Sequence, residues 1–170
     1  MEERRILSVL KRQATYVLDT TGINIWQLKE QVREIFVGGK EFKGLMVHIM
    51  SFGFKYGVPT DCDLVFDVRF IPNPYYIPEL REHTGNEMQV QDYVMQWNVA
   101  QEFLTQLMNM LEFLLPNYLK EGKNQLVVGI GCTGGKHRSV TIANRLNEGL
   151  QKKGYSVYLH HREIEGHSVK

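Results

Sequence analysis

The alternation of apolar and polar positions changes its period several times along the chain. Apolar residues at three- and four-residue spacing predict helices over 2–13, 25–36, 87–115 and 140–153. Shorter runs predict strands over 16–18, 63–69, 125–131 and 155–160, and a further continuous apolar run spans 44–51. We expect Pro116 to end the third helix, which is long enough to be broken once. Strands that alternate with helices favour an α/β fold with a mostly parallel sheet and flanking helices.

Two stretches interrupt this alternation and are predicted to be loops. Residues 52–59 are rich in glycine and aromatic residues, and residues 70–85 contain three prolines. Proline fixes its own backbone dihedral and restricts the residue before it, so the second stretch is expected to be extended. Residues 1–40 are predicted to form a helix, a strand and a helix without a core of their own. The predicted organisation is one globular domain, 41–170, with a short N-terminal unit.

Charge and cysteine usage narrow the class of protein. The 170 residues carry a formal net charge of +1, so nucleic-acid binding would need a local basic patch or an oligomer. Cys62 and Cys132 lack the spacing of a disulfide framework or a zinc site, which favours a reducing compartment. The N-terminus has no apolar run typical of a signal peptide or membrane span. We therefore expect a cytoplasmic chain without a membrane segment, and no metal site at His48, His83 or His167.

The segment from Gly129 to Ser139 carries the strongest signal for chemistry. It is glycine-rich and lies between a predicted buried strand and the start of a helix, where α/β folds collect ligands. Glycines let successive N–H groups turn inward, and the helix N-terminus adds positive potential, so the loop is suited to a phosphate-like anion. Three consecutive basic residues there would also favour an anion. The predicted ligand-binding residues of this loop are Thr133, Gly134, Gly135, Lys136, His137, Arg138 and Ser139.

The loop can be compared with two kinds of enzymatic phosphate-binding motif. It departs from the phosphate-binding loop of nucleotide hydrolases, because Ile130 stands where a glycine is required and His137 replaces the hydroxyl residue that holds magnesium. Cys132, Arg138 and Ser139 do match the Cys-x5-Arg-Ser spacing of cysteine-dependent phosphatases, in which a thiolate attacks phosphorus. Those enzymes usually have histidine before the cysteine, where this chain has Gly131. We therefore favour a non-catalytic loop, with a cysteine phosphatase as the alternative.

A second group of polar residues follows the strand predicted at 63–69. Asp67 and Arg69 share one face of that strand, and Asn73 follows in the proline-rich loop. If this face abuts the glycine-rich loop, the three side chains could bind hydroxyl or amino groups of a sugar phosphate. The competing interpretation is that Asp67 pairs internally with Arg69 or with backbone. Residues 160–162, two histidines and an arginine, could extend a basic rim after the last strand.

Three long motifs together resemble one known family. They are SFGFKYGVP at 51–59, DLVFDVRFIPN at 63–73 and GIGCTGGKHRSV at 129–140, with Leu80-Arg81 and Thr84-Gly85 between them. From about residue 2 to about residue 164 the chain is similar to the C-terminal domain of the RapZ/YvcJ family. Residues 1–40 look like the tail of that family's N-terminal P-loop domain, without its Walker motifs.

The resemblance implies a sensor and adapter function rather than catalysis. RapZ is an RNase adapter that binds small RNA, presents it to an endoribonuclease and senses glucosamine-6-phosphate through this domain. By position, Thr133, Gly134, Gly135, His137 and Arg138 would hold the sugar phosphate, with Asp67, Arg69 and Asn73 nearby. ATP or GTP with magnesium would bind only in the N-terminal domain, and a homo-oligomer is expected.

Two departures from the family pattern qualify that expectation. Tyr75 stands where some members have a histidine, which removes one expected ligand contact. Residues 165–170 replace a strongly basic tail associated with RNA binding in the adapter branch. Each lost phosphate contact weakens the salt-dependent part of nucleic-acid binding. The sequence therefore favours metabolite sensing over RNA delivery.

Overall fold

The computed structural model describes residues 20, 25, 28, 32 and 44–165. In the last range the helices and strands are β1 (Met46–Gly53), the 3-10 helix η1 (Phe54–Tyr56), β2 (Leu64–Asp67), the 3-10 helix η2 (Pro74–Tyr76), α3 (Met88–Met95), α4 (Asn98–Lys120), β3 (Gln125–Cys132), α5 (Arg138–Lys152), β4 (Ser156–His161) and α6 (Arg162–Glu165). The helix predicted at 2–13, the strand at 16–18 and the boundary after residue 40 lie outside the described residues. At 25–36 only Ile25, Leu28 and Val32 are described, and all three are helical.

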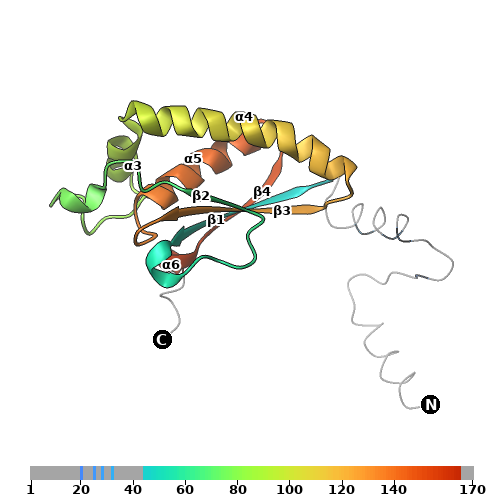
Figure 1. Cartoon of the computed structure of the whole chain (residues 1–170), viewed down its shortest axis with the longest axis horizontal. Helices are drawn as coiled ribbons and strands as arrows, with labels where there is room; N and C mark the ends of the chain where they lie inside the picture. The colour runs from blue at the N-terminus through green and yellow to red at the C-terminus, as the bar shows by residue number, and fades with distance from the viewer. Residues whose placement is uncertain (1–19, 21–24, 26–27, 29–31, 33–43, 166–170) are drawn as a thin grey trace, which may run out of the picture. The chain divides into compact units, whose positions relative to one another are not determined.

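The four strands form one sheet in the order β2-β3-β1-β4, and every neighbouring pair is parallel. Figure 1 shows α4 and α5 stacked over one side of this sheet. The α/β fold with a parallel sheet and flanking helices is therefore confirmed. The apolar run at 44–51 supplies the central strand β1, which extends through Gly53, so Phe52 and Gly53 are strand residues and not loop.

The hydrophobic core lies between the sheet and the two long helices. Parallel partners in register present their side chains on the same face, so Val47, Leu126 and Val157 form one row and Ile49, Val128 and Leu159 the next. Helix α5 packs on β1, β3 and β4, and α4 packs on α5. This arrangement explains why helical and strand periodicities in the sequence predict the same buried surface.

The helix predicted at 87–115 is broken once and ends later than expected. Residues 96 and 97 separate α3 from α4, and α4 continues through Pro116 to Lys120. An internal proline removes one hydrogen bond and costs about 3 kcal/mol. The helix continues because Leu107, Leu111 and Leu115 bury the same stripe against the core, which offsets that cost. No helix in the described part of the chain is both long and apolar enough to cross a membrane.

The opposite face of the sheet is covered by chain that runs from β1 to β2. Phe54 lies against Gly131, and the Cys62 thiol lies against Gly129: a methyl group there would come within 2.6 Å of the Phe54 ring and 2.8 Å of Cys62 Sγ. The two glycines were predicted both as the end of the strand at 125–131 and as the start of the anion-binding segment at 129–139, and they belong to β3. Their function in the fold is to let this crossover segment approach the sheet.

Candidate anion-binding site

The loop predicted to carry the chemistry lies at the carboxyl edge of the sheet. Residues 133–137 join β3 to α5, which begins at Arg138. The chain leaves β3 toward the face with helices, whereas it leaves β1 toward the opposite face. Adjacent parallel strands whose following segments diverge in this way create the crevice where open α/β sheets bind ligands. The position therefore supports a ligand site at residues 133–137.

The backbone of this loop is held tightly by the ends of β1 and η1. A methyl group at Gly53 would lie 2.7 Å from the carbonyl carbon of Gly134 and 2.8 Å from the nitrogen of Gly135. The Lys55 N–H donates to the Thr133 carbonyl at 3.1 Å. Gly135 has a φ of 71°, which favours glycine, while nothing lies within 4 Å of the side-chain direction of Gly134. Thr133 is exposed and Gly134 half-buried, so a ligand can approach this part of the loop.

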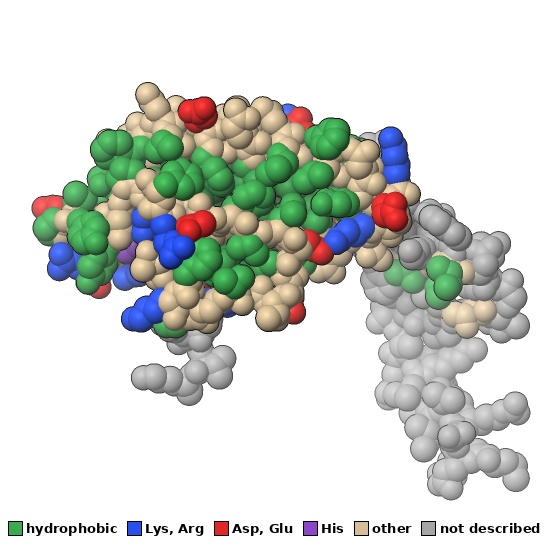
Figure 2. Space-filling view, viewed as in Figure 1, with side chains coloured by type: hydrophobic (Ala, Val, Ile, Leu, Met, Phe, Trp, Pro, Cys, Tyr) green, Lys and Arg blue, Asp and Glu red, His purple; other side chains and the backbone are tan. Residues whose placement is uncertain are grey.

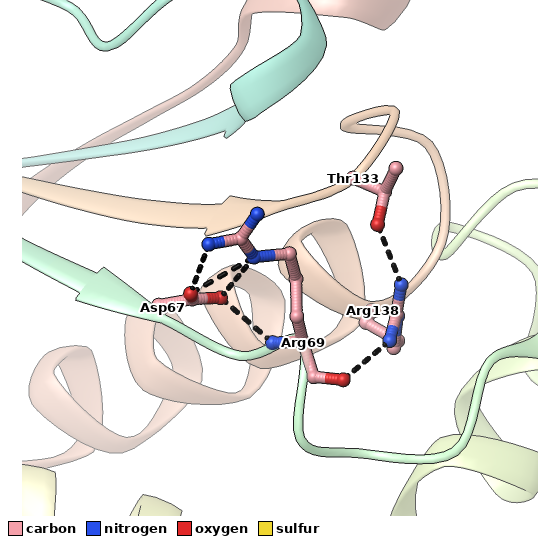
Figure 3. A network of polar contacts seen from close by, with 4 residues as sticks. All are labelled: Asp67, Arg69, Thr133 and Arg138. Carbon is pink, nitrogen blue, oxygen red and sulfur yellow. Dashed lines mark hydrogen bonds and ion pairs between the residues drawn. The ribbon is translucent and has the colours of Figure 1, made fainter.

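Arg138 connects the loop to the segment after β2. Its side chain is buried, the residue being only 4% exposed. Nη1 donates to the carbonyls of Arg69 at 2.8 Å and Ile71 at 2.9 Å, and Nη2 donates to Thr133 Oγ1 at 3.2 Å, as Figure 3 shows in part. Nε is buried, and among the described residues it has no hydrogen-bond partner. A buried guanidinium N–H that lacks a partner is costly, and an acceptor from a ligand would relieve that cost.

Asp67 and Arg69 form an ion pair beside this network. The Arg69 guanidinium donates to both carboxylate oxygens of Asp67, with Nη2 to Oδ2 at 2.6 Å, and it lies 4.3 Å from the centre of the Phe54 ring. These hydrogen bonds hold the pKa of Asp67 below its usual range. The side chains are 43% and 49% exposed. Figure 3 places the pair next to Arg138 and Thr133. Asp67 therefore does pair internally with Arg69, and this solvent-exposed pair also lies beside the loop.

The three basic residues of the loop differ in charge and role. Burial lowers the pKa of His137, the charge of Lys136 lowers it further, and Nε2 donates to the Arg81 carbonyl at 3.2 Å. Lys136 reaches toward Glu82, with 3.8 Å between Nζ and Oε2. The loop therefore carries less positive charge than its three adjacent basic residues suggest, because the lowered pKa of His137 favours the neutral imidazole.

The other predicted site residues are placed less directly. Asn73 caps η2, since its Oδ1 accepts from the Tyr75 N–H at 3.3 Å. Ser139 is fully buried, and its Oγ lies 3.1 Å from Cys132 Sγ. Cys132 is 3% exposed and belongs to the hydrophobic core beneath the helices. Among the described residues, no three His, Cys, Asp or Glu side chains gather as they would around a metal ion.

Comparison with known families gives a clear match. The model of the RapZ C-terminal domain matches residues 45–165, which include every element from β1 to α6. This chain belongs to the RapZ C-terminal domain family. The family resemblance inferred from the three motifs is thus confirmed. The motif residues at 129–140 correspond in this RapZ-type domain to the end of β3, the loop and the first turn of α5.

The curated relatives of this RapZ-type chain are longer proteins. A nucleotide-binding protein of Thermoanaerobacter sp. is 58% identical over 163 residues, and one of Caldanaerobacter subterraneus is 56% identical over the same length. A third, from Ruminiclostridium cellulolyticum, is 52% identical over 164 residues. Each alignment covers 96% of this chain but only 56% or 57% of the relative. The chain therefore spans little more than half the length of these relatives.

Two residues at the start of α6 lie beside the candidate site, of which Arg162 was predicted as part of a basic rim and Glu163 was not predicted. Arg162 donates from Nη2 to the carbonyls of Gly53 at 3.2 Å and Gly57 at 2.9 Å, and from Nε to Glu163 Oε1 at 2.8 Å. Glu163 in turn lies against Gly135 of the loop. The sequence pattern at 160–162 indicated only a basic rim, because nothing local reveals that α6 packs under the loop.

His161 is a further residue that the sequence placed incorrectly. It is 5% exposed, and its Nδ1 and Nε2 contact Ser51 Oγ at 2.8 Å and Asn144 Oδ1 at 3.2 Å. Asn144 donates to the Gly85 carbonyl at 3.1 Å, and the Gly85 N–H donates to the Lys136 carbonyl at 2.9 Å. His161 is thus part of a buried polar chain that supports the loop from the helix side of the sheet.

Proposed function

We propose that this chain is a non-catalytic sensor and adapter domain that binds a phosphorylated amino sugar at residues 133–138. Glucosamine-6-phosphate is the ligand expected from the family. The phosphate would contact Thr133, the Gly134 and Gly135 backbone, Lys136 and Arg138. Asp67, Arg69 and Asn73 would contact hydroxyl or amino groups of the sugar. Binding would then be communicated to RNA or protein partners that control amino-sugar metabolism.

The observation that carries this proposal is the state of Arg138. Its guanidinium is buried at the N-terminus of α5, two carbonyls and Thr133 fix it in position, and its Nε has no partner. The adjacent Thr133 and Gly134 are accessible. A fixed guanidinium, a helix N-terminus and the backbone of an accessible loop form a group of donors suited to phosphate. The exposed pair of Asp67 and Arg69 offers a polar wall beside it.

The burial of Cys132 favours this proposal over a cysteine-dependent phosphatase. An attacking thiolate must reach the phosphorus atom held by the loop. Cys132 instead ends a core strand, is 3% exposed, and lies against Ser139 Oγ. We therefore infer binding without turnover.

The properties of the whole protein are part of the same proposal. The relatives named as nucleotide-binding proteins extend well beyond the segment that this chain matches. Because the loop at 129–139 lacks the features of a P-loop, we infer that ATP or GTP with magnesium binds outside residues 44–165. An endoribonuclease with a small RNA, or a regulatory protein, would be the partner, and the assembly would be a cytoplasmic homo-oligomer.

Isothermal titration of the chain with glucosamine-6-phosphate tests the proposed site. We expect saturable binding, with inorganic phosphate weaker and glucosamine alone undetectable. Arg138→Ala should weaken binding about 10- to 100-fold, since a hydrogen bond to a charged group contributes about 1.5–3 kcal/mol. Arg145→Ala is the matched control, because Arg145 lies further along α5 and pairs with Glu148. Cys132→Ser should leave binding almost unchanged.

Three results would contradict the proposal. Absence of binding, or equal affinity for bare phosphate, would leave the loop without a specific sugar ligand. Loss of affinity in Arg145→Ala as large as in Arg138→Ala would place the ligand elsewhere. If the wild-type chain releases phosphate from the sugar phosphate and Cys132→Ser abolishes this release, the phosphatase would be supported instead. Thermal unfolding of each variant, monitored by circular dichroism, separates a lost contact from a lost fold.

A further inference from the structure

Glu163 is a buried carboxylate whose charge the site described so far does not use. Its side chain is only 10% exposed. Oε1 accepts from Arg162, with 2.8 Å to Nε and 2.6 Å to Nη2. Oε2 is buried, and no described residue donates a hydrogen bond to it. Burying a carboxylate oxygen without a hydrogen-bond donor costs free energy, so its presence at this position needs a functional explanation.

The unpartnered oxygen faces the anion-binding loop. A methyl group built on Gly135 would overlap both Oε2 of Glu163 and the backbone nitrogen of Gly53. Oε2 is therefore the atom of α6 closest to the loop at that glycine. The accessible Gly134 is the next residue, about 3.8 Å away along the Cα trace. A ligand at Gly134 would therefore lie within a Debye length of this carboxylate, about 8 Å at physiological salt, where salt screens charges only in part.

Arg162 and Glu163 form an ion pair whose negative end, Oε2, is directed at the loop. The Arg162 guanidinium contacts Oε1 and is shared with the carbonyls of Gly53 and Gly57, and its Cζ lies 5.5 Å from the centre of the Phe52 ring. The arginine therefore fixes α6 beneath the end of β1 and leaves Oε2 directed at the loop. A negative charge at that place opposes the binding of a bare anion. Binding is therefore more favourable for a ligand that carries a positive charge beside its phosphate, because that charge is attracted to the carboxylate.

We infer that Glu163 is a specificity-determining residue of this loop, which selects phosphorylated ligands that also carry a cationic amine over those that carry only hydroxyl groups. This inference rests on the proposed function, since it assumes that residues 133–138 hold the phosphate. In it Arg138 and the loop amides provide affinity for the phosphate, and the Glu163 carboxylate distinguishes an ammonium from a hydroxyl elsewhere on the ligand.

The test compares two ligands that differ at one group. The whole chain and its Glu163→Gln variant are titrated with glucosamine-6-phosphate and with glucose-6-phosphate. We expect the wild-type chain to prefer the amine-bearing ligand about tenfold, the size of one charge-assisted interaction. Glu163→Gln should remove most of that preference while its affinity for glucose-6-phosphate stays equal or rises. Glu148→Gln, an exposed carboxylate on α5, is the matched control and should keep the preference.

The ratio of the two affinities separates selectivity from a structural role. If Glu163 only fixes α6, the variant weakens both ligands alike and the ratio stays constant, which would overturn the inference. A wild-type chain that binds both sugar phosphates equally would also overturn it and leave the proposed phosphate site intact, provided that Arg138→Ala abolishes both. Absence of any binding to the wild-type chain would overturn both. If Glu163→Gln does not fold, the salt dependence of the wild-type preference takes its place. The ratio of the two affinities should fall as the salt concentration rises to about 1 M, where the Debye length is about 3 Å. A ratio that does not depend on salt would contradict an electrostatic origin.

Discussion

The two faces of the sheet are covered in different ways. On one face, α4 and α5 bury rows of aliphatic side chains that repeat along β1, β3 and β4. On the other, irregular chain from η1 to residue 63 and the short α6 pack against two glycines and Phe52. The first face provides stability through many similar contacts, whereas the second positions a few charged groups next to the loop. The two faces are thus packed by different means, and substitutions on them should differ in their effect on stability.

The largest effect is expected on the helix-covered face. Leu111 of α4 is fully buried, so Leu111→Ala should lower the free energy of unfolding by about 2–5 kcal/mol. Phe113 lies two residues away on the same helix and is 70% exposed, which makes Phe113→Ala the matched control, with a change under about 0.5 kcal/mol. Urea unfolding measures both. Similar losses in the two variants would show that α4 is not packed as described.

An intermediate effect is expected on the face without helices. In Gly131→Ala the new methyl group would lie 2.6 Å from the rings of Phe52 and Phe54, so one ring must move. We expect a cost of about 1–3 kcal/mol. Gly134→Ala adds the same group where nothing lies within 4 Å and should change stability by less than about 1 kcal/mol. Thermal unfolding measures both, and an undisturbed Gly131→Ala would contradict the close approach of η1 to β3.

The smallest effect should come from the ion pair of Asp67 and Arg69. Both side chains are about half exposed, so Asp67→Asn should cost less than about 1 kcal/mol at neutral pH. Because Arg69 lowers the pKa of Asp67 in the folded chain, this stabilisation is present above the usual carboxyl pKa of 3.8 and is lost as the pH falls through the lowered value. Unfolding of wild type and variant at neutral pH and near pH 2–3 measures it. A difference that persists in acid would exclude the carboxylate as its source.

The sequence predicted the helix-covered face well because its signals are local. Periodicity at 125–131 and 140–153 identified β3 and α5, and the position of the loop between them followed. The predicted end of the helix at Pro116 was wrong, since burial of Leu111 and Leu115 outweighs one missing hydrogen bond.

The site was predicted only in part because its packing depends on residues far apart in the chain. A glycine that admits a neighbouring side chain, such as Gly131, looks the same in sequence as one that turns an N–H toward a ligand. Arg138 and Thr133 were both among the predicted residues. Only the fold shows that Arg138 is buried and held in place, whereas Thr133 is exposed. Glu163 was missed because only the return of α6 beneath β1 brings it to Gly135.

The strand order also has a consequence for synthesis on the ribosome. The central strand β1 is made first, yet its two partners are β3, which starts at Gln125, and β4, which ends at His161. Non-local pairings of this kind slow folding, because the entropy of closing a long loop is lost before the stabilising contacts between the strands form. At about 5–20 residues per second, β1 must wait for several seconds until its neighbours have emerged. During that interval an apolar strand with both edges unpaired is exposed to aggregation, so the strand order that brings the loop at 133–137 to the middle of the sheet edge also delays the burial of β1.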